Sequence, residues 1–224
     1  MGWIIGIAVA VFVFTVVLVI ISRSDSRDSA QHEKDGASVT ERRGVQGEKT
    51  INHSLNRLIQ KDEYLLTNVL LPLRNGNTTE IDSILITRKG VFSIEIKNWV
   101  GHISGDDQSE FWIQEYDNPD MDDRKHRNPV EQNRRHCAVL ERILNNEINV
   151  QNIVIFPEIE DRTNLNSSYT FELDEFIEFY GNLPDNVIRE EEIKEIAEKL
   201  MPYEAALEEM EEHKEQVRDT YRND

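Results

Sequence analysis

The sequence has almost no cysteine. Cys137 is the single one among 224 residues, so an internal disulfide framework is excluded, and the composition suits a reducing compartment. The six histidines do not combine with Cys137 at the spacings of a zinc site. We therefore expect no structural zinc, and we interpret His102, His126 and His136 as surface or packing residues.

Two glycine-dependent signatures are also missing. The ten glycines form neither a phosphate-binding loop nor a nucleophile elbow, and both motifs need glycines at fixed spacings. The sequence also contains no internal repeat. These absences argue against an enzyme that acts on small molecules through a nucleotide or a serine nucleophile.

Basic residues are in the minority. Lys and Arg number 25 against 43 Asp and Glu, a formal net charge of −18, which is unfavourable for a polyanionic partner. The distribution is uneven, because residues 190–215 hold 11 glutamates and 3 lysines, whereas residues 124–142 hold six cations and two glutamates. The second stretch is either a solvated face or a basic stripe that contacts nucleic acid. In the second case, Arg134 and Arg135 are candidates for contact with a DNA backbone.

The acidic C-terminal region, residues 186–224, is expected to be helical, with the helix at residues 187–217. Its glutamates between residues 186 and 217 suit a protein partner. Alternatively, they mimic the charge of DNA and occupy the basic stripe, which would make the region autoinhibitory.

One long apolar run is present. Residues 3–21 contain no charge and, as a helix rising about 1.5 Å per residue, they match the hydrocarbon core of a lipid bilayer. The run is longer than a signal-peptide core and lacks a small-residue cleavage site, so we predict an uncleaved transmembrane anchor at residues 1–22 and a flexible tether at residues 23–43. Arg23 and Arg27 follow the run, and no Lys or Arg precedes it. The positive-inside rule then predicts a single-pass protein of the cell membrane, with its N-terminus outside and its soluble domain in the cytoplasm.

From Gly44 onward, the hydrophobic pattern alternates between helix and strand. This alternation predicts an α/β domain with a mixed central sheet flanked by helices. Strands are predicted at residues 63–73, 78–87, 91–99 and 152–157, with a further hairpin at 101–105 and 111–114. Helices are predicted at residues 44–60, 128–146, 173–182 and 187–217.

Two of these helices have a recognisable apolar face. The expected face of the first consists of Val45, Ile51, Leu55, Leu58 and Ile59. The second begins with Asn128 and Pro129, a capping residue followed by a first-turn proline. Its expected apolar face consists of Val130, Cys137, Leu140 and Leu144.

The first predicted hairpin carries charges among apolar residues. If Ile86 pairs with Val91, Asp82 lies opposite Glu95, with the two Cβ atoms about 4.5–5.5 Å apart. Two facing carboxylates repel each other, and a divalent cation such as Mg²⁺ between them removes the repulsion. Lys97 shares the face of Glu95, where it can position or activate a water or stabilise charge on a phosphate. The alternative is an ordinary Glu–Lys pair on an exposed face.

These charged residues belong to a longer pattern. It consists of Gly44-x-x-Gly47-Glu48, then Ile81-Asp82, then Gly90-Val91-Phe92-x-Ile94-Glu95-x-Lys97-Asn98-Trp99-x-Gly101, then Asn128-Pro129-x-x-Gln132. In its order and spacing, from Gly44 to Phe156, the pattern resembles the nuclease-related domain family, NERD. It has Ile81 rather than a proline before Asp82.

The resemblance implies a PD-(D/E)xK nuclease fold over residues 44–160, completed by a strand and a helix within residues 161–185. It also implies cleavage of phosphodiester bonds in DNA, with Mg²⁺ or Mn²⁺ as the cofactor. The implied site consists of the metal ligands Asp82, Glu95 and Glu48, the catalytic Lys97, and Gln132.

Glu48 and Gln132, taken alone, also fit a helix-surface acid and a neighbour of a helix cap. Arranged as the resemblance implies, Glu48 adds a carboxylate to the site, and Gln132 hydrogen-bonds a water or a phosphate. The sequence therefore predicts a membrane-anchored, metal-dependent nuclease-like protein. The alternative is a non-catalytic module that binds nucleic acid or a protein on the same fold.

Overall fold

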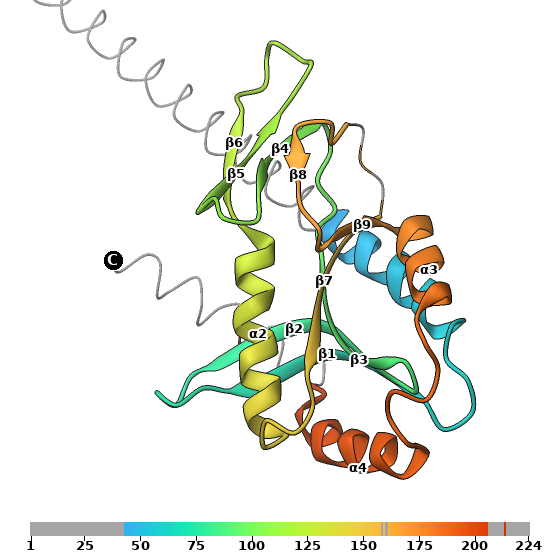
Figure 1. Cartoon of the computed structure of the whole chain (residues 1–224). Coiled ribbons are helices and arrows are strands. Elements are labelled where there is room, and N and C mark those ends of the chain that lie inside the picture. Colours follow the sequence, from blue (N-terminus) through green and yellow to red (C-terminus); the bar gives the residue numbers. More distant parts are fainter. Residues whose placement is uncertain (1–42, 158, 160, 206–212, 214–224) are drawn as a thin grey trace, which may run out of the picture. The chain divides into compact units, whose positions relative to one another are not determined.

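The computed structural model of the chain describes residues 43–157, 159, 161–205 and 213 (Figure 1). The expected transmembrane anchor and the expected tether lie outside these residues, apart from Arg43, which is already helical. Within the described ranges, no helix combines the length and the apolar character needed to cross a membrane.

The main sheet has five strands in the order β1-β2-β3-β7-β9. They are β1 (Tyr64–Pro72), β2 (Thr78–Thr87), β3 (Gly90–Ile96), β7 (Val150–Phe156) and β9 (Thr170–Glu172). The first three pair antiparallel, whereas β7 pairs parallel with β3, and β9 pairs parallel with β7. The sheet is therefore mixed, as the sequence predicts, and β9 lies in the region where a further strand is expected.

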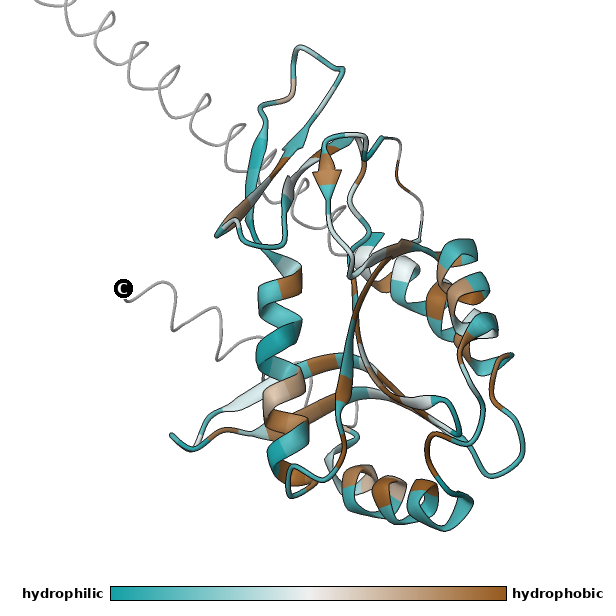
Figure 2. Cartoon of the chain, in the orientation of Figure 1, coloured by the Kyte–Doolittle hydropathy of each residue, from teal (hydrophilic) through white to brown (hydrophobic). Residues whose placement is uncertain are grey.

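Helices cover both faces of this sheet (Figure 1). They are the first helix (residues 43–56), α2 (Pro129–Ile143), α3 (Leu173–Asn182) and α4 (Glu190–Leu200). The first helix and α3 pack apolar residues around Phe92 on one face, and α2 and α4 pack around Ile84 on the other. Figure 2 shows hydrophobic residues along the strands between these two helical layers.

A second sheet of four short strands has the order β6-β5-β4-β8. Its strands are β4 (His102–Asp106), β5 (Phe111–Glu115), β6 (Arg124–Arg127) and β8 (Leu165–Asn166). The antiparallel pair of β4 and β5 confirms the predicted second hairpin. Strand β6 is not predicted, because its sequence RKHR has no apolar alternation. A buried cluster, which includes Trp112 of β5 and Phe156 of β7, joins the two sheets.

Helix α2 begins where the sequence predicts. The Asn128 side-chain oxygen accepts hydrogen bonds from the backbone N–H groups of Val130 and Glu131, and Pro129 occupies the first turn. The Asn128 side-chain amide also donates to the backbone oxygens of Asp106 and Ser109. The cap therefore fixes the start of α2 against the second sheet. The predicted apolar face of the helix, Val130, Cys137, Leu140 and Leu144, is buried.

The predicted C-terminal helix at residues 187–217 is confirmed between Glu190 and Leu200, but it does not continue unbroken beyond Leu200. Helix α4 ends at Leu200, and the chain continues as a 3₁₀ turn, Met201–Tyr203. That turn contains a proline, which cannot donate the next helical hydrogen bond. Glu204 then forms an isolated antiparallel bridge with Val69 of β1.

Two smaller expectations also need correction. Val45 is 39% exposed, so the apolar face of the first helix starts at Ile51, which is fully buried together with Leu55. Strand β3 ends at Ile96, so the three residues that follow it, up to Trp99, extend beyond the sheet.

Candidate active site

The strands that carry the predicted acids separate beside the site. The expected pair Ile86–Val91 is present in the ladder between β2 and β3. The ladder ends at the pair Ser83–Ile94. The end of β3 therefore loses its β2 neighbour just before Glu95.

Asp82 occupies this separation point. Its Oδ2 accepts a hydrogen bond from the Ile96 backbone N–H at 2.7 Å. The expected direct pairing of Asp82 with Glu95 is therefore absent from the ladder. The Asp82 carboxylate thus takes the place of a β2 carbonyl as the acceptor for the Ile96 N–H. This hydrogen bond keeps Asp82 next to the part of β3 that carries Glu95.

Glu95 is the most buried acid of the site, with 2% of its side chain exposed. Its Oε1 lies 2.5 Å from Nζ of Lys97, whose side chain is 21% exposed. Its Oε2 is buried without a hydrogen-bond partner, and the same is true of Nδ1 of His136, which lies 3.5 Å away. An unpaired buried polar atom is rare in folded proteins, and here two such atoms face each other.

Burial and charge shift the pKa values of this cluster. The pKa of Asp82 is raised well above its usual value, first by burial and second by the negative charge of Glu95. Burial disfavours the Lys97 ammonium, but the charges of Glu95 and Asp82 outweigh it and raise the Lys97 pKa. Lys97 therefore keeps its positive charge in this acidic cluster. The Glu48 charge acts on both Asp82 and Lys97 in the same direction as Glu95.

The placement of Glu48 depends on a close approach of the first helix. A Cβ atom added at Gly47 would lie 2.7 Å from Cβ of Asn98, shorter than real contacts allow. A glycine at this position lets the helix pack against the segment that follows β3. Glu48, the next residue, is half-buried at this end of the helix. The predicted third carboxylate is thus near the site, as the resemblance implies.

Gln132 lies on α2 and lines a hollow of about 740 Å³, which we call the α2 hollow. The lining residues that matter below are Thr78, Glu80, Arg127, Gln132, Arg135, His136 and His213. His213, from the acidic C-terminal region, lies with Nδ1 2.8 Å from Oγ1 of Thr78. Within the described residues, no hydrogen bond joins Gln132 to Asp82 or Glu95. Gln132 therefore belongs to the approach to the acids, one helical turn from His136.

The histidines divide into packing residues and one site residue. His126 stacks on Trp99 with ring centroids 4.2 Å apart. His102 bonds the carboxylates of Asp117, in the loop between β5 and β6, and Asp161, between β7 and β8. His136, unlike these two half-buried rings, is buried, and it faces Glu95. Burial lowers the His136 pKa, which favours a neutral ring. The sequence signal for His136 was its position four residues after Gln132.

Asn133 was also missed, and it fixes the height of α2 above the strands. Its Oδ1 accepts a hydrogen bond from Ser93 Oγ at 2.7 Å. Its Nδ2 donates to the backbone oxygens of Ser93 and Ile153 and to the side-chain oxygen of Asn152. The Asn152 amide continues to the Val130 oxygen. This buried network ties α2 to both β3 and β7. It therefore sets where His136 stands relative to Glu95.

The donor set fits a hard divalent cation with few protein ligands. Among the described residues, no group of three or more His, Cys, Asp or Glu side chains is assembled as a metal cage. Mg²⁺ commonly takes only one or two protein carboxylates and completes its shell with water and phosphate. The unpaired Oε2 of Glu95 and the carboxylate of Asp82, whose charges interact, meet that requirement, although Lys97 already occupies Oε1.

Comparison with known proteins identifies the family of the chain. The family model of the nuclease-related domain matches residues 43–157, about half of the chain. An uncharacterized protein of Bacillus anthracis is 33% identical over 106 residues, which make up 47% of this chain and 49% of that protein. The chain thus spans about half the length of this relative. No solved structure gives a match. The chain, with both acids and the lysine inside the matched range, belongs to the nuclease-related domain family, NERD.

Proposed function

We propose that this protein is a membrane-tethered, metal-dependent nuclease that hydrolyses phosphodiester bonds in DNA. The observation that carries the proposal is the buried carboxylate of Glu95, whose Oε2 has no partner while Lys97 and Asp82 flank it. A purely structural ion pair would leave no such atom unpaired. Membership of the nuclease-related domain family supports the same reading.

Each residue then has a defined role. Asp82 and Glu95 would hold Mg²⁺ or Mn²⁺, and Glu48 would add a carboxylate through a water or directly. The bound ion would polarise the phosphate and make a water more acidic. Lys97 places its ammonium where negative charge develops on a phosphate oxygen and stabilises it. Gln132, which is neutral, orients a water or a phosphate oxygen in the α2 hollow.

A plasmid assay tests the catalytic part. The full chain in detergent is incubated with supercoiled plasmid in Mg²⁺, Mn²⁺ or EDTA, beside Glu95→Gln and Lys97→Met. We expect cutting that needs the metal and falls at least about 100-fold in both variants, because one removes a proposed metal ligand and the other the ammonium that stabilises the phosphate. The matched controls are Glu198→Gln and Lys199→Met on exposed positions of α4. Cutting that survives both site variants would disprove the assignment.

A non-catalytic module is the second candidate, and two observations favour it. Lys97 already neutralises one oxygen of Glu95, and the described residues hold no three-donor metal cage. A wild-type chain that is folded and binds DNA but cuts neither DNA nor RNA in either metal would support this candidate.

The membrane anchor is proposed from the apolar residues 3–21. We expect the full chain in the membrane fraction, with the domain that begins at Arg43 protected from protease added outside the cell. Degradation of that domain by external protease would reverse the proposed orientation. Recovery of the chain in the soluble fraction would exclude the proposed membrane anchor.

The acidic C-terminal region is proposed to limit access to the site. The contact between His213 and Thr78 places one residue of this region at the wall of the α2 hollow. We expect a chain that ends at Ala205 to bind DNA more tightly than the full chain, because negative charge is removed from the approach. Equal affinity of the two chains would exclude autoinhibition.

A further inference from the structure

Strand β6 presents two cations on one exposed face. Lys125 and Arg127 are two residues apart on the strand, so their side chains point to the same side. Both lie over the ring of Phe111 on β5, with Lys125 Nζ 3.9 Å and Arg127 Cζ 5.7 Å from its centroid. The opposite face of the pair is the buried one, since Trp112 and Gln114 are covered. The aromatic ring therefore holds two solvent-exposed cations side by side.

This cationic face continues into the α2 hollow. Arg127 and Arg135 both line that hollow, together with Gln132 and His136. His136 in turn lies 3.5 Å from the Oε2 of Glu95. The cations thus extend from the second sheet into the hollow, whose lining includes His136 next to Glu95, in a chain whose net charge is strongly negative.

We propose that Lys125, Arg127 and Arg135 form a grip for the phosphodiester backbone of the nucleic acid that the site acts on. The inference rests on the proposed function for its substrate and adds the surface that holds it. Guanidinium groups bind phosphate through two parallel hydrogen bonds, which suits the exposed Arg127 and Arg135. Contacts of this kind position a strand without reading its bases. Binding is therefore independent of sequence.

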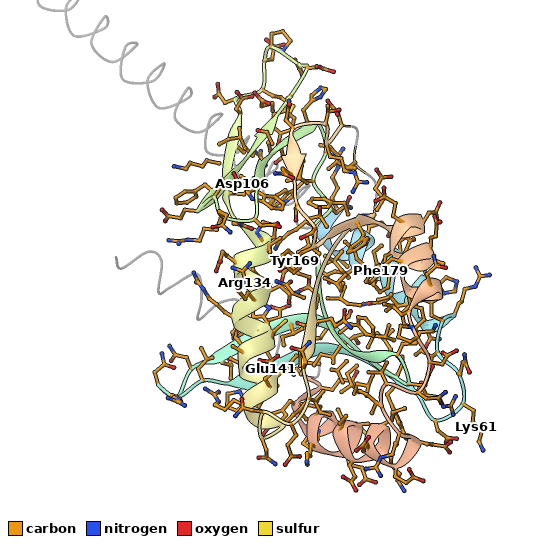
Figure 3. All side chains as sticks on the ribbon, in the orientation of Figure 1. Lys61, Asp106, Arg134, Glu141, Tyr169 and Phe179 are labelled. Carbon is orange, nitrogen blue, oxygen red and sulfur yellow. The ribbon has the colours of Figure 1, made fainter. Side chains whose placement is uncertain are left out.

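Arg134 is not part of the grip. It forms an ion pair with Glu131 on the same helix, and its guanidinium lies 5.9 Å from the ring centroid of Tyr169. Figure 3 shows Arg134 on α2 near Tyr169. Of the two arginines that the sequence offered, the structure thus favours Arg135, because it lines the α2 hollow.

Acidic residues bound the grip. Glu110 lies 4.0 Å from Arg127, and Glu80 lines the hollow as well. At the other end of the hairpin, the loop from residue 116 to 123 carries four aspartates and no cation. The strand order places Arg127 at the end next to α2 and the acidic loop at the far end. Glu131, which is paired with Arg134, lines the hollow as well, so Arg127 and Arg135 lie among acids there, and the aspartates of the loop repel a polyanion from the tip of the hairpin.

A binding experiment tests the grip separately from catalysis. The probe is a short fluorescein-labelled DNA duplex of mixed sequence, titrated with the full chain in EDTA while anisotropy is recorded over a range of salt. The test variant combines Lys125→Gln, Arg127→Gln and Arg135→Gln. The control combines Lys61→Gln, Lys194→Gln and Lys199→Gln, which changes the net charge equally at exposed positions outside the grip.

We expect the test variant to bind at least about tenfold more weakly at low salt, with a salt slope reduced by about 0.9 for each lost phosphate contact. The control should change both quantities only slightly. Equal losses in the two variants would mean that net charge, not the grip, governs binding. Unchanged binding in the test variant would also overturn the proposal. Thermal unfolding confirms that both variants are folded.

The outcomes separate the grip from the nuclease. If the wild type does not cut DNA and only the test variant loses DNA binding, the grip is supported and the protein is a non-catalytic binding module. If the wild type cuts and the test variant binds and cuts equally well, the nuclease stands and the grip falls. A second variant, Asp120→Asn with Asp122→Asn and Asp123→Asn, should bind more tightly at low salt. Unchanged or weaker binding of that variant would contradict the repulsion assigned to the loop.

Discussion

Two groups of buried polar residues lie side by side under α2, and they differ in how far their hydrogen bonds are satisfied. Around Asn133, no buried side-chain atom among the described residues lacks a partner. Around Glu95, two atoms lack one, Glu95 Oε2 and His136 Nδ1. The groups use neighbouring positions, because Ser93 and Glu95 are two residues apart on β3, and Asn133 and His136 are three apart on α2.

This difference separates framework from site. A satisfied buried network makes a structure rigid and specific, whereas each unsatisfied buried group costs about 1–3 kcal/mol of stability. Such a cost is expected where a site keeps atoms available for a ligand. The Asn133 group therefore holds α2 in place, and the Glu95 group uses that fixed geometry.

The largest expected effect is on the framework. Asn133→Ala removes four hydrogen bonds and leaves Ser93 and Asn152 with unpaired buried groups, so we expect the free energy of unfolding to fall by about 3 kcal/mol. Urea denaturation measures it, with the exposed Asn149→Ala as a control that should change by less than about 0.5 kcal/mol. A similar small change in Asn133→Ala would abolish the distinction between the two groups.

The next effect concerns the contact that places Glu48. Gly47→Ala pushes a Cβ to 2.7 Å from Asn98, and overpacking of this kind costs about 1–3 kcal/mol. Gly44→Ala, which meets nothing within 4 Å, should be neutral or stabilising, because alanine favours helix over glycine. Thermal unfolding should therefore show a lower midpoint for Gly47→Ala and an unchanged or higher midpoint for Gly44→Ala. If both shift equally, the close approach does not constrain the helix.

A smaller effect of unusual sign is expected in the site. Asp82→Asn removes a buried charge that lies beside Glu95 and keeps an oxygen for the Ile96 N–H. We expect stability to stay constant or rise by about 1 kcal/mol, while cutting is lost. As a control, Asp106→Asn weakens a carboxylate that bonds Ser109 and whose pKa is lowered, so it should destabilise. A marked loss of stability in Asp82→Asn would make that residue part of the framework.

The smallest effect is on the surface. Hydrogen bonds to Asp161 and Asp117 raise the pKa of His102, so the folded chain binds this proton more tightly than the unfolded chain. The resulting stability is fully present below the usual histidine pKa of about 6.5 and is lost as pH rises through the raised value. Unfolding midpoints of wild type and His102→Gln should therefore differ at acidic pH and converge at alkaline pH. A constant difference would assign the role of His102 to packing.

The sequence allowed the hairpin register and the start of α2 to be predicted, because local rules decide both. Two apolar strands joined by a short turn that contains a glycine indicate the pairing of Ile86 with Val91, and Asn128 with its following proline marks a helix start. The same register brought Asp82 and Glu95 together. It did not reveal that the strands separate there, since strand separation depends on what α2 and the second sheet place around it.

Asn133 and His136 were harder to predict, because a polar residue on a helix looks the same in sequence whether it is buried or exposed. The signal was their spacing: both fall on the same side of α2 as Val130 and Cys137. Strand β6 could not be predicted from its own sequence, RKHR, because its strand structure depends on pairing with β5. Phe111 of β5 supports its cations.

The 3₁₀ turn after α4 has a consequence for how the protein behaves when it is shortened. Strand β1 is an edge of the main sheet, and Glu204 and Ala205 lie along its outer side. The Glu204 carboxylate accepts the N–H of Thr67, and the Ala205 N–H reaches the oxygen of Asn68. An uncovered strand edge pairs with other chains. These two residues therefore cover part of the β1 edge. A chain that ends at Leu200 would keep every helix and strand of the site but expose this edge, so we expect it to aggregate more readily.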